Sequence, residues 1–459
     1  MLRTFTIQTL GCKVNQYESQ QIHTLLTGLG LAAVRPGQKP DLTIVNTCCV
    51  TKAAAAKSRQ FISKAQKLNH GSVVVAVGCL TASPQKSEQP QSFVENVYLI
   101  KNRSAIAAEL NTIVQSRLYR DTAPQEPSRP IINNIRPQNG QKSKPKSTCD
   151  PLKLPELTAF AGHTRAFLKA QDGCDNYCTY CIIPIVRPRI ESRPIDSICR
   201  EAEQLVKSGH KEIVLTGICL GAFGRDTTRR QNWTNPETDY LAQLLEKLAL
   251  TPDLHRLRIS SLNPQDITPQ LLDIPAKHTN IMPHLHLSLQ SGSNNILKKM
   301  ARLYTAEDYL EKVRMLNSCL ENPAITTDII VGFPGETESD FQQTLELCKE
   351  VGFSRIHVFS FSARRGTPAE KMSPKIKPQI IKERAAILQK IADDLAYQYR
   401  ENFIGRRERI LIESVENGTA AGRAERYFEV KIENPSPALK TNQIIEVTLM
   451  QNTNGSLIA

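Results

Sequence analysis

Q-D-G-C-D-N-Y-C-T-Y-C, residues 171–181, lies at the end of an apolar strand pattern, F-L-K-A-Q. Its cysteines, Cys174, Cys178 and Cys181, have the spacing C-x3-C-x2-C. A short loop with three soft thiolates at this spacing can bind three irons of a 4Fe-4S cluster, and it lacks the fourth cysteine of a simple electron carrier. The iron without a protein ligand is then open to substrate. A zinc knuckle is disfavoured because no fourth ligand is nearby.

The residues around this loop predict a barrel. Six apolar runs alternate with helical patterns: A-F-L-K-A, E-I-V-L-T-G-I, L-R-I-S-S-L, H-L-H-L-S-L, I-T-T-D-I-I-V-G and R-I-H-V-F-S-F. We therefore expect an open parallel (βα)6 barrel over residues 156–400, with its site at the carboxyl ends of the strands. The polar residues and glycines at those ends are the candidate ligand contacts: Thr216, Gly217, Ser260, Ser261, Gln290, Ser291, Asp328 and Gly332. A turn role is an equally good interpretation of each one singly.

Two histidines share one face of the fourth of these runs. His284 and His286 are two residues apart, so both side chains point the same way in a strand. Metal ligation is one interpretation, but strand histidines are more often structural. We therefore leave both out of the predicted ligand set.

The first 116 residues predict a separate parallel-sheet, flavodoxin-like domain. The chain here repeats one pattern of apolar strand, tight turn and helix, and three such strands end in T-L-G-C at Cys12, V-N-T-C at Cys48 and A-V-G-C at Cys79. Ligands of parallel sheets bind beyond the carboxyl ends of the strands, so three thiols are expected at one edge. They suit an iron–sulfur cluster, while buried cysteines or zinc with an additional ligand are the alternatives. Cys49 follows Cys48 directly, and its side chain should point away.

Composition limits the class of protein. The chain has 459 residues and a net charge of +13, which favours a polyanionic partner. It has no run of 18 apolar residues, so we expect a cytoplasmic protein without a membrane contact. Twelve cysteines under reducing conditions indicate metal or redox chemistry rather than disulfides. Six cysteines lie outside the two triplets, and besides Cys49 we expect ordinary thiols at the other five: Cys149, Cys199, Cys219, Cys319 and Cys348.

The remaining segments predict a linker and a small domain. Residues 117–155 are basic and rich in proline, which is typical of a mobile linker. Residues 401–459 contain three short alternating patterns, E-R-I-L-I-E-S-V, R-Y-F-E-V-K-I and Q-I-I-E-V-T-L, which predict a small all-β barrel. Tyr427 and Phe428, near Arg423 and Arg426, are expected to be exposed and to stack on nucleic-acid bases, and a core role is the alternative for one of the two.

The cysteine loop and its barrel resemble the radical S-adenosylmethionine (SAM) enzymes. With the N-terminal triplet, the chain is similar to the methylthiotransferases among them, through T-L-G-C-K-V-N-Q-Y-E, V-N-T-C, V-G-C, C-x3-C-x2-C-I-I-P, L-Q-S-G-S-N, D-I-I-V-G-F-P-G-E-T and F-S-A-R-R-G-T-P-A. The resemblance covers nearly the whole chain except the linker. It departs at Pro188, where the family has glycine, and at Glu191, where it has a basic residue.

The resemblance implies two 4Fe-4S clusters, one bound by Cys12, Cys48 and Cys79 and one by Cys174, Cys178 and Cys181 together with SAM. It implies that the eight polar residues and glycines named above contact SAM, and that the C-terminal domain is a TRAM domain. The implied substrate is the anticodon loop of tRNA, held by basic residues such as Arg364, Arg365, Lys375 and Lys377. An electron donor of unknown identity is also implied, and we expect a monomer.

T-L-G-C-K-V-N is similar to the branch that methylthiolates carbon 2 of N6-threonylcarbamoyladenosine at position 37 of tRNA. The resemblance implies SAM as radical source and methyl donor, and sulfur delivered through the N-terminal cluster. Related branches act on isopentenyladenosine in tRNA or on a ribosomal protein. An alternative of another class is a non-catalytic zinc and RNA-binding protein.

Overall fold

The computed structural model describes residues 2–35, 37–68, 71–83, 96–118, 153–225, 237–453 and 455–459. Residues 119–152, most of the predicted linker, lie outside this part of the chain, and Cys149 lies there too. The chain divides into two compact units: Met1–Leu10, Glu18–Cys48 and Ala56–Glu156 in the first, and Gly11–Tyr17, Cys49–Ala55 and Leu157–Ala459 in the second. No helix among the described residues has the length and apolarity needed to cross a membrane.

The first unit contains a parallel sheet with the strand order β2-β1-β3-β4-β5. The strands are β1 (Thr4–Thr9), β2 (Ala32–Ala33), β3 (Leu42–Thr47), β4 (Val73–Gly78) and β5 (Val97–Leu99). β3 and β4 are buried along their whole length, as their apolar runs predict. The helices are α1 (Lys13–Gly28), α2 (Lys52–Leu68) and α3 (Ile106–Leu118). Side chains of α1 and α3 pack into one core and those of α2 into another, so helices cover both faces. This strand order is that of flavodoxin-like sheets.

The second unit contains the barrel. Its parallel strands are β6 (Arg165–Asp172), β8 (Glu212–Gly217), β9 (Arg256–Ile259), β10 (His284–His286), β11 (Ala324–Val331) and β12 (Arg355–Ser360). They form two sheets, which isolated parallel bridges from Leu257 to Ile281 and from Leu262 to Leu287 join. The short β7 (Glu191–Ser192) pairs antiparallel with the other edge of β6. The predicted six-fold βα repeat is therefore confirmed.

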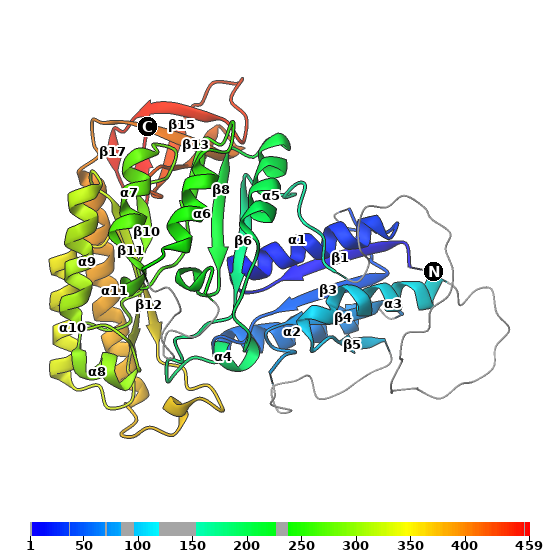
Figure 1. Cartoon of the computed structure of the whole chain (residues 1–459), viewed down its shortest axis with the longest axis horizontal. Coiled ribbons are helices and arrows are strands. Elements are labelled where there is room, and N and C mark those ends of the chain that lie inside the picture. The colour runs from blue at the N-terminus through cyan, green and yellow to red at the C-terminus, as the bar shows by residue number, and fades with distance from the viewer. Residues whose placement is uncertain are drawn as a thin grey trace. The chain divides into compact units, whose positions relative to one another are not determined.

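Helices cover the outside of these strands, as Figure 1 shows for α9, α10 and α11 beside β10 to β12. Their bounds are α4 (Ile183–Val186), α5 (Ile195–Lys207), α6 (Tyr240–Ala249), α7 (Pro269–Lys277), α8 (Asn294–Lys299), α9 (Ala306–Cys319), α10 (Glu338–Val351) and α11 (Pro378–Glu401). Capping boxes at Thr305 and Thr337 begin α9 and α10. One continuous core of leucine, isoleucine, valine and phenylalanine joins helices and strands.

Residues after α11 form a six-stranded, mostly antiparallel sheet with the order β16-β13-β14-β15-β18-β17. The strands are β13 (Arg407–Glu416), β14 (Thr419–Ala424), β15 (Glu429–Glu433), β16 (Ile444–Thr448), β17 (Gln451–Asn452) and β18 (Leu457–Ile458). The small all-β domain is confirmed. β14 was not predicted because T-A-A-G-R-A has few of the β-branched and aromatic residues that mark strands.

Tyr427 and Phe428 are half-buried, so the prediction that they are exposed is wrong, while their stacking on bases stays a prediction. Tyr427 has φ +73° and lies in a turn, so the alternation expected of a strand does not apply. Its ring stacks on His284 at 4.7 Å, and its hydroxyl accepts a hydrogen bond from Arg165 Nη1 at 2.9 Å. The ring of Phe428 packs on Phe403 at 5.2 Å. Both rings therefore contact protein.

Candidate functional site

The cysteine loop begins at the carboxyl end of β6 with a tight turn at Gly173. Its φ is +78°, and a Cβ atom there would lie 1.8 Å from the carbonyl oxygen of Arg189. Only glycine fits this position. Asp172 Oδ1 accepts hydrogen bonds from the Gly173 N–H at 2.8 Å and from Arg187 Nη1 at 2.5 Å. The turn that presents Cys174 is thus fixed despite the departures at Pro188 and Glu191.

The far end of the loop is held by α8 and by aromatic packing. The Thr179 N–H donates to the Met300 carbonyl at 3.1 Å, and Thr179 Oγ1 donates to the Lys299 carbonyl at 2.8 Å. The ring of Tyr180 meets Phe333 edge to face at 6.4 Å. The backbone between Cys178 and Cys181 is therefore positioned from both sides.

The three cysteines of the loop line one cavity of about 330 Å³. Arg302 Nη1 donates to Cys178 Sγ at 3.1 Å, and the Ile183 N–H donates to Cys181 Sγ at 3.4 Å. Burial raises the pKa of Cys181 well above its ordinary value, so in the absence of metal this sulfur is a thiol. Three sulfurs with fixed donors form a ligand set that fits an iron–sulfur cluster, and binding would release protons.

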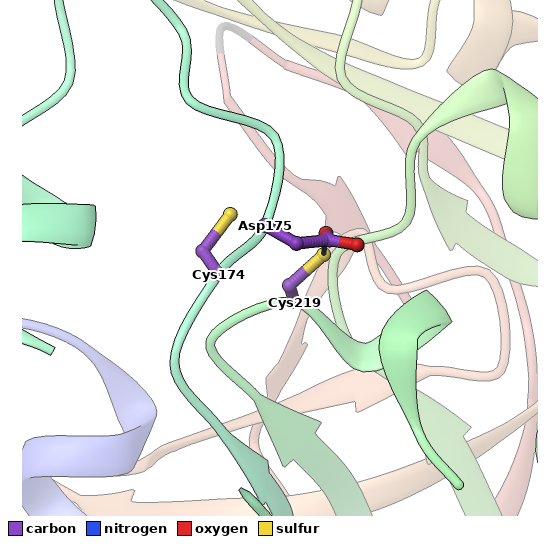
Figure 2. A group of neighbouring side chains, drawn as sticks. All are labelled: Cys174, Asp175 and Cys219. Carbon is purple, nitrogen blue, oxygen red and sulfur yellow. Dashed lines mark hydrogen bonds between the residues drawn. The ribbon is translucent and has the colours of Figure 1, made fainter. Parts of the chain in front are cut away.

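Cys219 also lines this cavity, and its prediction as an ordinary thiol is wrong. It follows β8, and its sulfur, Cys174 Sγ and an Asp175 carboxylate oxygen all lie within 4.8 Å of one another. Figure 2 shows the Asp175 carboxylate beside the Cys219 sulfur. Cys219 Sγ donates to Asp175 Oδ1 at 3.8 Å. A hydrogen bond from Cys219 lowers the pKa of Cys174 and, in return, raises that of Cys219. The structure therefore provides a thiol donor beside one expected cluster ligand.

Arg302 is a second residue that the sequence interpretation missed. Besides Cys178, it donates from Nη2 to Asn263 Oδ1 at 2.6 Å and from Nε to the Tyr304 hydroxyl at 2.9 Å. All three branches of its guanidinium are thus bound, so its charge is aimed at the sulfur. It follows α8 in a segment without a recognisable motif, and no sequence signal marked it.

Of the eight predicted SAM contacts, Ser261, Gln290 and Asp328 line the cavity among the described residues. Ser288, Asn263 and Ser360 add further polar groups, and Ile218, Ile330 and Phe359 add apolar ones. Such a mixture is typical of a small-molecule site. These three residues keep their predicted role as a proposal.

The other five predicted contacts do not line this cavity. Ser291 Oγ is 3.3 Å from Thr344 Oγ1, and the Gly332 N–H donates to Glu336 Oε2 at 2.8 Å. Thr216 and Ser260 are buried, and Gly217 packs against Gln171. The structure gives these residues local contacts, as turn and strand-end residues commonly have.

Cys48 and Cys79 follow the neighbouring strands β3 and β4. Thr47 pairs with Gly78, and the Cys79 N–H donates to the Thr47 carbonyl at 3.0 Å. The Cys48 N–H donates to Ser58 Oγ at 3.0 Å, and Arg103 Nη1 is 3.8 Å from Cys79 Sγ. The sheet therefore brings these two thiols to one edge.

The other two N-terminal cysteines differ in exposure. Cys12 is exposed and lies in the turn before α1, with its sulfur 3.9 Å from Asn15 Oδ1. Cys49 is buried. A cluster bound by Cys12, Cys48 and Cys79 together stays a prediction.

Two family profiles match the chain. Residues 168–348 match the Radical SAM superfamily, and residues 4–99 match Uncharacterized protein family UPF0004. The solved structure of a radical SAM methyltransferase, TsrM from Kitasatospora setae with cobalamin and a [4Fe-4S] cluster bound, has a TM-score of 0.53 at 16% identity. That match covers 92% of this chain and 77% of the other and shows the shared fold.

Curated relatives match over nearly the whole chain. Threonylcarbamoyladenosine tRNA methylthiotransferase MtaB of Thermotoga maritima is 35% identical, over 93% of this chain and 91% of that protein. The Bacillus subtilis protein of the same name is 33% identical, over 98% and 94%. A tRNA-2-methylthio-N(6)-dimethylallyladenosine synthase of Pelotomaculum thermopropionicum is 30% identical, over 90% and 87%.

Proposed function

The chain belongs to the radical SAM methylthiotransferase family, and from this premise we propose that it methylthiolates carbon 2 of N6-threonylcarbamoyladenosine at position 37 of tRNA. The assignment of the substrate rests on the identity of 35% with a threonylcarbamoyladenosine enzyme over 93% of the chain. The relative named for dimethylallyladenosine has an identity of 30%, so that substrate is the second candidate.

The barrel site supplies what the family's radical chemistry requires. Cys174, Cys178 and Cys181 would hold the 4Fe-4S cluster, and Ser261, Gln290 and Asp328 would contact SAM in the same cavity. With both bound, the site supplies a carbon-centred radical strong enough to remove hydrogen from an aromatic carbon, which no side-chain base achieves. Arg302 donates to one of the cysteine sulfurs, and Ile218, Ile330 and Phe359 form an apolar part of the cavity wall.

The N-terminal cysteines supply a second ligand set in this proposal. Cys48 and Cys79 at adjacent strand ends, together with Cys12, would hold a second 4Fe-4S cluster that carries the sulfur. SAM would then serve twice, as radical source and as methyl donor. Arg103 Nη1, 3.8 Å from Cys79 Sγ, is placed to donate to this sulfur.

The substrate is expected to bind as a single-stranded loop, which needs less unstacking than a duplex base. Arg365, Lys375 and Lys377 are exposed after the carboxyl end of β12 and are the proposed phosphate contacts. Arg364 is 2% exposed, so its predicted phosphate contact is wrong: the side chain is buried. An electron donor is required, and a monomer is part of the proposal.

Nucleoside analysis of tRNA tests the substrate. A strain that lacks the gene should lose the 2-methylthio derivative of threonylcarbamoyladenosine and regain it with the wild-type gene but not with Cys178→Ala. Loss of the methylthio isopentenyladenosine instead would show that the enzyme acts on isopentenyladenosine, the second candidate substrate. Unchanged tRNA with an altered ribosomal protein would reject both.

Cys48→Ala and Cys49→Thr test the second cluster. After anaerobic reconstitution, wild type should hold about eight irons, and Cys48→Ala about four, because one of three thiolate ligands is missing. SAM cleavage should persist in Cys48→Ala while methylthiolation is lost. Cys49→Thr is the matched control and should keep about eight irons. Loss of iron in Cys49→Thr but not in Cys48→Ala would show that Cys49 is the ligand. Stoichiometric zinc without iron in the wild type would favour a non-catalytic zinc protein.

A further inference from the structure

Three side chains from consecutive strands meet inside the barrel, apart from the cysteine loop. They are His286 on β10, Asp328 on β11 and His357 on β12. Asp328 pairs directly with His357, and His286 pairs with Thr326, two residues before Asp328. Side chains of paired residues, and of residues two apart in one strand, point to the same face. The register therefore places all three on one face of the sheet.

The atoms of this group are close enough to share one ion. One ligand atom from each residue lies within 4.8 Å of the others. His286 Nε2 is 3.3 Å from Asp328 Oδ2, and the two imidazole rings have their centroids 5.9 Å apart. Two imidazoles and one carboxylate on rigid strands form the ligand set that iron(II) and zinc sites use, with positions left open for other ligands.

A neighbouring hydroxyl orients the first histidine. His286 Nδ1 is 3.1 Å from Thr326 Oγ1, and this hydroxyl is in turn 3.3 Å from His284 Nε2. Nδ1 is thus engaged, so Nε2 is the atom that faces Asp328. Metal-binding histidines commonly have such a partner on the other ring nitrogen, which fixes the ring and its tautomer.

The ligand atoms of the group favour one class of metal. Two of the three are imidazole nitrogens, from His286 and His357. The group has one carboxylate, whereas Mg²⁺ and Ca²⁺ depend on oxygen ligands. Metals that prefer imidazole nitrogen are therefore selected.

We propose that His286, Asp328 and His357 bind one divalent transition-metal ion of the Fe²⁺, Co²⁺ and Zn²⁺ class. Asp328 also lines the cavity that contains the loop cysteines, whereas His357 lines a second cavity of about 560 Å³ with Thr326 and Tyr427. The metal site lies where these two cavities approach each other. The open positions of the ion would take an oxygen or nitrogen atom of a ligand in either cavity.

Cobalt binding to the holoenzyme tests this site. Oxidised 4Fe-4S clusters are diamagnetic, so added Co²⁺ gives a high-spin electron paramagnetic resonance signal without interference. The enzyme is reconstituted with iron and sulfide first, so that the cluster cysteines are occupied. Retained cobalt is then counted by mass spectrometry, and its affinity is measured by titration. About one cobalt per chain is expected, with nitrogen and oxygen ligands and no thiolate.

His357→Ala should lower the cobalt affinity by at least tenfold, and Thr326→Val by roughly 10–100-fold, because it removes the partner of His286 Nδ1. His255→Ala is the matched control, since His255 is exposed before β9. The iron content of each variant reports whether the fold and clusters persist. Equal cobalt binding by His357→Ala and wild type, or no retention by wild type, would overturn the proposal. Neither result depends on the tRNA assay, so the site and the proposed function fail separately.

Discussion

The two ends of the barrel strands use charged and polar residues in opposite ways. At the carboxyl ends, which we call the mouth, Cys174, Cys178, Cys181 and their polar neighbours surround an open cavity. At the amino ends, which we call the floor, the buried carboxylate of Glu212 meets two buried guanidiniums. Arg258 Nε donates to Glu212 Oε1 at 3.0 Å, and Arg256 Nη1 is 3.6 Å from Glu212 Oε2.

The floor groups also hold the C-terminal β domain. Arg256 donates to the backbone carbonyls of Arg423 and Arg409 at 2.9 and 2.6 Å, and Arg258 donates to that of Glu425 at 2.9 Å. Nearby guanidiniums, Arg258 first, outweigh burial and hold the pKa of Glu212 below its ordinary value. Polar groups at the floor are therefore enclosed by protein partners, whereas those at the mouth line a cavity that a ligand can enter. Charged and polar residues are thus structural at the floor, where protein groups surround them, and available for function at the mouth, where they line the cavity. The residue type alone does not distinguish the two roles.

The largest expected effect is at the mouth. Cys178→Ala removes one of three cluster ligands, so methylthiolation and SAM cleavage should fall below detection and iron should drop from about eight to about four per chain. Iron analysis and chromatography of 5′-deoxyadenosine measure both. Secondary structure by circular dichroism should be unchanged, because the floor is intact. SAM cleavage at the wild-type rate would contradict the assignment of the mouth.

The second effect is at the floor. Glu212→Gln keeps the shape of the side chain but leaves Arg256 and Arg258 buried without their counter-charge. Breaking a buried pair in this way costs about 3–5 kcal/mol of unfolding free energy. Urea denaturation measures it, with Glu203→Gln as the matched control. Glu203 is exposed on α5 and 3.8 Å from Lys207, so its loss should cost less than about 1 kcal/mol. Equal losses of unfolding free energy in both variants would contradict the claim that the buried floor pair stabilises the fold more than a surface pair does.

The sequence predicts the mouth better than the floor. Cys174, Cys178 and Cys181 lie in one short loop, so their spacing alone indicates shared ligation. Cys219 and Arg302 reach the same cavity from other segments, and nothing in a linear pattern reports that proximity. No sequence motif includes His357 either, because its neighbours His286 and Asp328 lie on other strands, β10 and β11.

The strand patterns of the floor were predictable, but its partners were not. Arg256 and Arg258 alternate correctly for a strand, yet the carbonyls that bind them come from residues 409–425. Tyr427 was assigned to a strand, and its left-handed φ instead turns the ring toward His284. The partners of the two arginines and the orientation of Tyr427 therefore depend on long-range contacts and a backbone turn, which residue types and periodicity do not report.

A smaller effect is expected at the edge of the mouth. Cys219→Ala removes a thiol that lies within 4.8 Å of Cys174 Sγ, and a donor close to a cluster sulfur raises the reduction potential. A weak bond of about 0.5–1 kcal/mol corresponds to a fall of roughly 20–45 mV for a one-electron couple. A redox titration followed by electron paramagnetic resonance measures it. Cys199→Ala, on α5, is the control. A rise of the potential, or no change, would show that Cys219 does not donate to the cluster ligand.

The smallest effect concerns tRNA affinity and follows from the same comparison. The floor arginines add to the net charge of +13 but are paired with protein groups, so they should not attract phosphate. The exposed Lys375 belongs to the segment that contacts the cysteine loop, where the Ala369 N–H donates to the Thr179 carbonyl at 2.9 Å. It therefore lies on the mouth side of the barrel.

Lys375→Ala should weaken tRNA binding roughly threefold at physiological salt and reduce the slope of log affinity against log salt by about 0.7, the value for one single-strand phosphate contact. Filter binding at several salt concentrations measures both quantities. Lys207→Ala is the matched control, because Lys207 is 67% exposed on α5 and paired with Glu203. Equal losses of tRNA affinity in the two variants would mean that tRNA binding depends on net charge alone, and that the mouth is not a specific RNA-binding surface.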